Sequence, residues 1–394
     1  MTEQGTPLTS VFYRRDGLDP GPELRDAQRE EPVRRVQDFW LYTTGEYWLV
    51  TRYADVRRVL ADSETFAMHD PARSQILPPE LLNADAPEHT RLRHVLAPEF
   101  TVKRVRGLEP MITAAVDGLL DAMESTGAPA DLMSAFALPL PAMVMCDLLG
   151  VPVEDREDFQ RRARISLDLS LPMEQRLAAN RQSHDYMAVL VEGKRREPDE
   201  RLIGRLIREH DDAVSDDELV GVADILLLAG HETVSNMLGL ATLALLTRPE
   251  QAARLRDAAP DDPVIGTAVE ELLRHLAVSS TALARTARRD TEIAGVAVKA
   301  GDQVVCQLPV ANRDPALGVG MDHLDIGREP VSHLTFGHGA HRCLGASLAQ
   351  AELRVALPAL LRRFPRLALT GSPEDLPYRH NHEVYGLYSL PVTW

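Results

Sequence analysis

Cys343 is the residue whose surroundings most favour chemistry. It lies in the glycine-rich stretch 336–346 and is followed directly by a helical pattern that starts at Ser347. Neighbouring glycines allow positive φ angles, so the backbone can approach a flat partner closely. The peptide dipoles at a helix N-terminus favour a thiolate and lower the thiol pKa below its free value of about 8.5. A lone cysteine in a turn is more often structural, but this stretch predicts an anionic sulfur able to bind a metal.

The order of residues around Cys343 is more specific than the cysteine itself. Phe336-x-x-Gly-x-His-x-Cys-x-Gly345 resembles the haem-ligand loop of the cytochrome P-450 family, the haem-thiolate monooxygenases. The resemblance implies that Cys343 binds the iron of haem b and that Phe336, His341 and Gly345 contact the cofactor. Arg342 departs from the family pattern, because many bacterial relatives carry an aromatic residue there, and it adds positive charge beside the cysteine.

The longest helical pattern begins with a capping box at 215–218 and continues to about Leu246. Its run over 219–246 is apolar enough to raise the alternative of a membrane span. Asp224 and Glu232 make that alternative expensive, and no basic flanks or aromatic belt support it. We therefore expect this helix to run through the core of a soluble protein.

The middle of this helix contains the polar segment 229–233. Gly230 weakens the helix, and the Thr233 hydroxyl can compete for the carbonyl of Ala229, which would open a local groove. Alone, such a segment is more often a tolerated polar kink. It resembles the family's oxygen-binding motif, which implies that Glu232 and Thr233 deliver protons during catalysis and that Ala229 and Gly230 lie beside the haem.

Four basic residues match family positions that bind the haem propionates. His89 and Arg93 stand four residues apart in a helix expected to begin at 85–88, so they share one face. A solvated basic face is the alternative for this pair. The resemblance implies that both residues bind propionate, together with Arg285 and His341.

Glu271 and Arg274 stand three residues apart in a helix expected over 264–276. A surface pair at this spacing would contribute only tenths of a kcal/mol. In the family the pair is buried and joined by an arginine from the irregular segment before the haem loop, and Arg328 matches that arginine. The resemblance therefore implies a structural role for all three. Leu324 replaces a phenylalanine often found in this segment.

Weaker patterns complete the expected architecture, a mainly α protein with a minor β-rich part. We expect helices over 53–61, 105–123, 139–149, 153–167 and 174–196, and a loop over 66–83. Strands are expected over 33–36 and 47–51 around Gly45, over 281–286, 291–293, 296–299 and 303–308, and as a final pair within 383–393. The joint at 166–173 resembles the family's mobile lid. No linker divides the chain, so we expect one cytochrome P-450 domain over 1–394, with its β-rich part mainly at 33–51, 281–308 and 383–393.

Composition excludes several classes of protein. Only 3 cysteines in 394 residues rule out a disulfide framework, and a net charge of -16 argues against nucleic-acid and anionic-membrane partners. The first residues carry no signal-peptide pattern. We therefore expect a cytoplasmic protein, most simply a monomer.

The resemblance implies a monooxygenase that uses dioxygen and two electrons for hydroxylation or epoxidation. No flavin or iron–sulfur sequence is present, so we expect a ferredoxin and its reductase as partners, docking on a basic patch formed by Lys103, Arg104, Arg106 and Arg342. We expect a bulky hydrophobic substrate from secondary metabolism, such as a polyketide or terpenoid, in an apolar pocket lined by Leu77, Leu82, Leu167, Leu169, Ile225, Leu226, Val278, Leu283, Val384 and Tyr385. The alternatives are an oxidative coupling enzyme of the same fold and a cysteine-ligated haem sensor or electron carrier.

Overall fold

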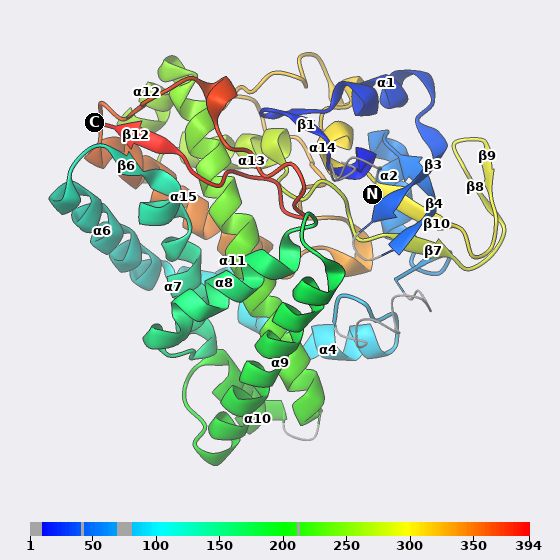
Figure 1. Cartoon of the computed structure of the whole chain (residues 1–394), viewed down its shortest axis with the longest axis horizontal. Helices are drawn as coiled ribbons and strands as arrows, with labels where there is room; N and C mark the ends of the chain where they lie inside the picture. Colours follow the sequence, from blue (N-terminus) through cyan, green and yellow to red (C-terminus); the bar gives the residue numbers. More distant parts are fainter. Residues whose placement is uncertain (1–9, 41–42, 69–80, 211–212) are drawn as a thin grey trace. The chain divides into compact units, whose positions relative to one another are not determined.

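The structure is a computed structural model that describes residues 10–40, 43–68, 81–210 and 213–394. It divides into two compact units, each built from separate stretches of chain. Figure 1 labels many of the helices and strands of both units. The first unit consists of Met1–Asp85, Asp261–Cys343 and Tyr378–Gly386, and the second of Ala86–Pro260, Leu344–Pro377 and Leu387–Trp394. The single domain stays a prediction, and each unit is described by itself.

A five-stranded sheet forms the framework of the first unit. Its order is β3 (Val33–Trp40), β4 (Thr43–Val50), β10 (Gln303–Cys306), β7 (Arg285–Ala287) and β5 (Phe66–Ala67). β4 and β10 are parallel, with Val304 opposite Trp48, and the other pairs are antiparallel. The first strand pair is longer than predicted, because Gly45 lies inside β4 opposite Asp38 rather than in a turn. β5 also corrects the expectation of a continuous loop after residue 66.

Helices and small strands surround this sheet in the first unit. They are β1 (Arg15–Asp16), β2 (Asp19–Pro20), α1 (Pro22–Glu30), α2 (Tyr53–Ala61), α13 (Pro263–Leu276), β8 (Thr291–Ile293), β9 (Val296–Val298) and α14 (Leu308–Ala311). The bounds of α2 confirm the prediction, and Gly295 turns the β8–β9 hairpin with a φ of 83°. The apolar core includes Val50, Leu60 and Phe66.

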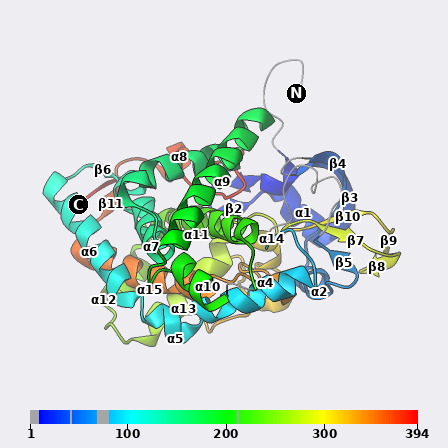
Figure 2. The same ribbon diagram turned by 90° about the horizontal axis from the view of Figure 1, so that it is seen from below.

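The second unit is mainly helical. Its helices are α4 (Glu88–Leu96), α5 (Val102–Arg106), α6 (Glu109–Thr126), α7 (Pro139–Leu149), α8 (Arg156–Leu167), α9 (Met173–Arg196), α10 (Leu202–His210), α11 (Asp216–Leu246), α12 (Pro249–Asp257) and α15 (Ala346–Arg363). A three-stranded sheet joins β11 (Ala368–Leu369), β12 (Pro391–Thr393) and β6 (Ala130–Asp131). α11 packs against α7, α9 and α15, which are labelled around it in Figure 2.

The long helix α11 begins as its sequence predicts. The Ser215 hydroxyl oxygen accepts from the Glu218 N–H at 3.3 Å, and the Glu218 carboxylate accepts from the Ser215 N–H at 2.9 Å. These two bonds satisfy backbone donors that the first helical turn leaves unpaired. Among the described residues, no helix has the length and apolar character needed to span a membrane.

α4 begins within the predicted range 85–88 but without the predicted cap, and another predicted helix is divided in two. α4 begins at Glu88 without a side-chain cap, because Asp85 accepts from the Met68 N–H at 2.9 Å and pairs with Arg288 at 2.8 Å instead. The helix expected over 105–123 is two helices, α5 and α6, since the chain turns at Gly107.

The prediction of a final pair of strands within 383–393 is also wrong. Val384 forms only an isolated bridge with Ser279, within the first unit. β12 pairs with β11 and with β6, two-residue strands that the sequence did not reveal. Each of these partners is too short to show a period of its own.

Candidate active site

The loop that carries Cys343 has a tightly fixed backbone. Gly337 and Gly339 adopt φ angles of 69° and 74°, a region that other residues rarely enter. A Cβ at Gly339 would collide with the carbonyl oxygen of Leu60 at the end of α2. The Cys343 N–H donates to the Phe336 carbonyl at 2.8 Å. These constraints hold an exposed cysteine in place three residues before the start of α15.

The other two cysteines have a different environment. Cys146 and Cys306 are both buried. Burial disfavours the charged form and raises the pKa of the Cys146 thiol to about 11 and that of Cys306 to about 12. Both therefore remain protonated at neutral pH, which leaves Cys343 as the cysteine suited to bind a metal as a thiolate.

The four predicted propionate ligands are placed on different elements. In the first unit, Arg285 is buried on β7 and donates to the Leu283 carbonyl at 2.6 Å, and His341 is half-buried in the short helical turn Gly339–His341. In the second unit, His89 is buried and Arg93 half-buried on α4. Basic side chains favour anionic ligands, so the pair in each unit suits a carboxylate such as a haem propionate.

Glu271, Arg274 and Arg328 are brought together in the first unit. Two parallel bonds of 2.7 and 2.8 Å join Arg274 to the Glu271 carboxylate, and Arg328 donates to the same carboxylate at 3.1 Å. The side chains of Glu271 and Arg274 are only 3% and 1% exposed. The Asp325 N–H also donates to Glu271 at 3.0 Å, so this group ties the irregular segment to α13.

The polar segment of α11 forms the local hydrogen bond that its sequence predicts. The Thr233 hydroxyl donates to the Ala229 carbonyl at 2.7 Å. Glu232 is buried, and the Asn236 amide donates to its carboxylate at 3.4 Å and to its carbonyl at 2.8 Å. His231 lies edge-on to Phe159 of α8, with ring centroids 5.3 Å apart. This contact gives the buried His231 a role in packing α11 against α8.

Gly230 has a packing role that the sequence did not predict. A Cβ at this position would lie 2.5 Å from the sulfur of Met145, which belongs to α7. The glycine therefore admits a neighbouring side chain as well as weakening the helix.

A strip of α11 stays accessible although most of the helix is buried. The accessible strip consists of Asp224, Ile225, Leu226, Leu228, Ala229, Gly230 and Thr233, of which Ala229 is exposed and the others are half-buried. These residues recur at helical spacing, so they form one continuous surface. The surface is apolar except for Asp224 at one end and Thr233 at the other.

Asp224 is a polar feature of this strip that sequence reasoning missed, because it was weighed only as a charge against membrane insertion. Burial raises the pKa of its carboxyl to about 7, and the nearby Arg162 on α8 only partly opposes the shift. The carboxyl therefore binds a proton at a higher pH than an ordinary aspartate does.

The predicted substrate-pocket residues differ in exposure. Leu77 lies outside the described residues. Leu82, Leu169, Ile225, Leu226 and Leu283 are half-buried, whereas Leu167, Val278, Val384 and Tyr385 are buried. The Tyr385 hydroxyl donates to the Gly17 carbonyl at 2.7 Å, and the Arg15 guanidinium lies 5.0 Å from its ring centre. Tyr385 thus takes part in the packing of the first unit, and its contact with substrate stays a prediction.

Comparison with known proteins agrees with this set of features. A family model described as Cytochrome P450 matches residues 36–317 and 321–384. The chain belongs to the cytochrome P450 family. Cytochrome P450 FAS1 of Rhodococcoides fascians is 43% identical over 404 residues, covering 99% of this chain and 100% of the relative. The Vitamin D(3) 25-hydroxylase of Pseudonocardia autotrophica is 40% identical, covering 100% of this chain and 98% of the relative. The crystal structure of CYP105P1 in complex with filipin I has a TM-score of 0.90 at 39% identity, with 97% of each chain covered.

Membership of the cytochrome P450 family makes the protein a monooxygenase with a haem-iron cofactor. The predicted fold class is confirmed by the likeness to solved members. The residues of the chain fit the cofactor, because an exposed cysteine lies on a glycine-fixed loop and the basic donor set suits two carboxylates.

Proposed function

We propose that the protein is a haem b monooxygenase that inserts one oxygen atom from dioxygen into a bulky hydrophobic molecule, by hydroxylation or epoxidation. Haem iron with a thiolate ligand supplies the activation of dioxygen. Cys343 provides the thiolate. The two propionates are bound by the basic side chains of His89, Arg93, Arg285 and His341.

The accessible strip of α11 is the main observation that supports this proposal. It presents apolar side chains with one hydroxyl at its end, which suits a hydrophobic substrate held beside a group that can pass a proton. Two relatives are consistent with a hydrophobic substrate, since one is named for vitamin D(3) hydroxylation and another was solved with filipin I. We infer a hydrophobic secondary metabolite, such as a polyketide or terpenoid, as the substrate class.

A metabolite screen tests the substrate class. Binding of a substrate should shift the haem from low to high spin, which absorption spectra report. Each hit is then incubated with NADPH, ferredoxin and ferredoxin reductase, the electron donors we infer. A product that gains one oxygen atom supports monooxygenation. A product that loses two hydrogens without gaining oxygen identifies a coupling enzyme. The absence of substrate-dependent NADPH consumption identifies a carrier or sensor.

The cytoplasmic location and the monomeric state stay predictions.

Arg93→Ala should lower haem retention, because each charge-assisted hydrogen bond to a propionate contributes about 1.5 to 3 kcal/mol. Haem content per polypeptide, measured after purification and dialysis, checks the prediction. Arg91→Ala is the matched control, since Arg91 lies on the same helix but pairs with Glu218. Equal haem content in both variants would remove Arg93 from the propionate site.

The hydroxyl of Thr233 is the proposed proton donor of the site. It lies on the accessible strip, whereas the Glu232 carboxyl is buried against Asn236. Thr233 can therefore reach a bound ligand and donate to it once its hydroxyl leaves the Ala229 carbonyl, and Glu232 can replenish the proton by turning toward Thr233. An apolar strip otherwise excludes the water that would deliver protons.

Thr233→Ala should lower the ratio of oxidised product to NADPH consumed severalfold and release more hydrogen peroxide, with haem and substrate binding nearly unchanged. Product, NADPH and peroxide are quantified together. Thr242→Ala is the matched control, because the Thr242 hydroxyl makes the same kind of bond, to Leu238 at 2.9 Å, in a buried part of α11. Undiminished coupling in Thr233→Ala would show that protons follow another route.

A further inference from the structure

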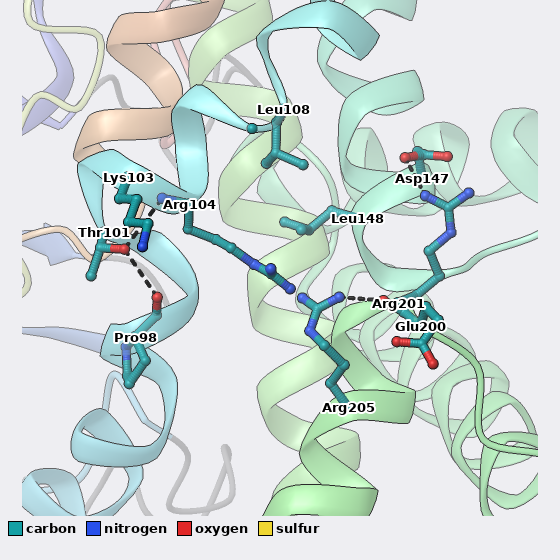
Figure 3. Close-up of a pocket in the computed structure, with 11 residues that line it drawn as sticks. Pro98, Thr101, Lys103, Arg104, Leu108, Asp147, Leu148, Glu200, Arg201 and Arg205 are labelled. Atoms are coloured by element: carbon teal, nitrogen blue, oxygen red, sulfur yellow. Dashed lines mark hydrogen bonds and ion pairs between the residues drawn. The ribbon is translucent and has the colours of Figure 1, made fainter.

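A pocket of about 490 Å³ opens in the second unit beside α5, the end of α7 and the start of α10 (Figure 3). Its walls come from three stretches of chain, at 98–108, 147–148 and 200–205. Pockets of this volume hold small organic ligands. Its residues include none of those proposed above to bind haem or substrate.

Positive charge converges on this pocket from two helices. Arg104 comes from α5 and Arg205 from α10, and Figure 3 shows their guanidinium groups pointing toward each other. Two like charges that face each other repel unless an anion lies between them. Glu99 supplies one negative charge for two guanidinium groups, because its carboxylate pairs with Arg205 and also with Arg104 at 3.3 Å. One positive charge therefore remains uncompensated.

Among the other charged residues that line the pocket, only Lys103 adds to this excess of positive charge. Arg201 and Asp147 neutralise each other at 2.5 Å. Glu200 pairs at 3.0 Å with Arg208, which lies outside the lining. Lys103 lines the pocket and forms no ion pair with any residue that the structure describes. Lys103 thus contributes a second uncompensated charge, in a protein whose net charge is -16.

Part of the pocket wall is apolar. Leu148 lies above the two facing guanidinium groups in Figure 3 with Leu108 higher in the same view, and Pro98 also contributes to the lining. The pocket therefore offers two charges to an anionic group and an apolar surface to whatever that group carries.

We propose that this pocket binds a small dianion with a short apolar body, either a phosphate monoester or a dicarboxylate. Its anionic group binds beside the Glu99 carboxylate, where it contacts Arg104 and Arg205 and pairs with Lys103. The ligand neutralises the two charges that the protein leaves uncompensated, and its apolar body packs on the two leucines. The binding site is independent of the proposed monooxygenase reaction.

Calorimetric titration of the haem-loaded protein tests the proposal. Phenyl phosphate and phenylsuccinate serve as probes for the two anion types, at constant ionic strength because salt screens such interactions. We expect one saturable site for at least one probe, and weaker binding of inorganic phosphate, which lacks the apolar body. Lys103→Ala should weaken the binding about tenfold or more, as expected for a lost charge-assisted bond.

Lys103 is the informative position because it has no ion pair whose loss could disturb the fold. Arg106→Ala is the matched control, since Arg106 lies on the same helix with the same charge but outside the lining, and this variant should bind like the wild type. Absence of saturable binding of both probes overturns the proposal, as does equal weakening by the two variants. If an acidic ferredoxin depends on Lys103 while neither probe binds, these charges serve protein docking and the proposal is wrong.

Discussion

Replacing Cys343 by histidine should abolish the thiolate-type Soret band of the reduced carbonyl complex, together with all monooxygenase turnover. Imidazole can bind iron, so the variant still tests ligation in a protein that retains haem. It cannot supply the electron donation of a thiolate, on which dioxygen activation in this family depends. Absorption spectra of the reduced protein under carbon monoxide measure the first effect, and substrate-dependent NADPH consumption measures the second.

The other two cysteines provide internal controls for this experiment. Cys146→Ala and Cys306→Ala remove buried thiols whose pKa values are raised to about 11 and about 12. Both variants should keep the thiolate-type band. Retention of that band by the Cys343→His protein, or its loss from either control, would show that the ligand is assigned to the wrong residue.

Local patterns predicted the parts of this protein that depend on neighbouring residues. The capping box at Ser215 and Glu218 and the Thr233 bond to Ala229 each lie within four residues of chain. Gly339 needs its positive φ for a turn that its own sequence encodes. Interactions over such short separations are visible in sequence because the same residue types at the same spacing repeat the same geometry.

Pairings between distant segments could not be predicted in this way. β12 pairs with β6 about 260 residues away, and both strands are too short to show alternation. Asp85 would cap a helix on local grounds, but Met68 and Arg288 compete for its carboxylate through tertiary contacts. Tertiary contacts override local helix-capping propensity when the folded chain supplies a better partner for the side chain.

Sites assembled from several elements were the hardest to foresee. The basic residues at 103–104 suggested a protein-docking patch, but only the structure reveals that α10 brings Arg205 opposite Arg104. Gly230 similarly suggested a weakened helix, whereas its missing side chain also accommodates Met145 of α7. In each case the deciding neighbour lies on another helix, and a single sequence without its partners cannot specify it.

Arg274→Ala should lower the free energy of unfolding by about 3 to 5 kcal/mol, the usual cost of breaking a buried ion pair from one side. All five N–H groups of Arg274 are used. Two bind Glu271, and the others donate to three backbone carbonyls, those of Asn312 and Met321 at 2.8 Å each and of His323 at 3.3 Å. The variant therefore leaves a buried carboxylate short of one partner and three carbonyls short of a donor.

Equilibrium unfolding in guanidinium chloride, followed by far-UV circular dichroism, measures this loss against a total stability of about 5 to 15 kcal/mol for a typical protein. Arg161→Ala is the matched control, because Arg161 pairs with Asp158 at the same three-residue spacing, but with 56% and 60% of the two side chains exposed. That variant should unfold like the wild type. If the two variants lose similar stability, burial adds nothing to the Arg274 pair, and a scaffold role for Glu271, Arg274 and Arg328 is untenable. A large loss confined to Arg274→Ala would instead mean that the buried Arg274 guanidinium is needed to hold the irregular segment before the Cys343 loop on α13, even though Arg328 also joins Glu271 to the carbonyls of Gly320 and His323.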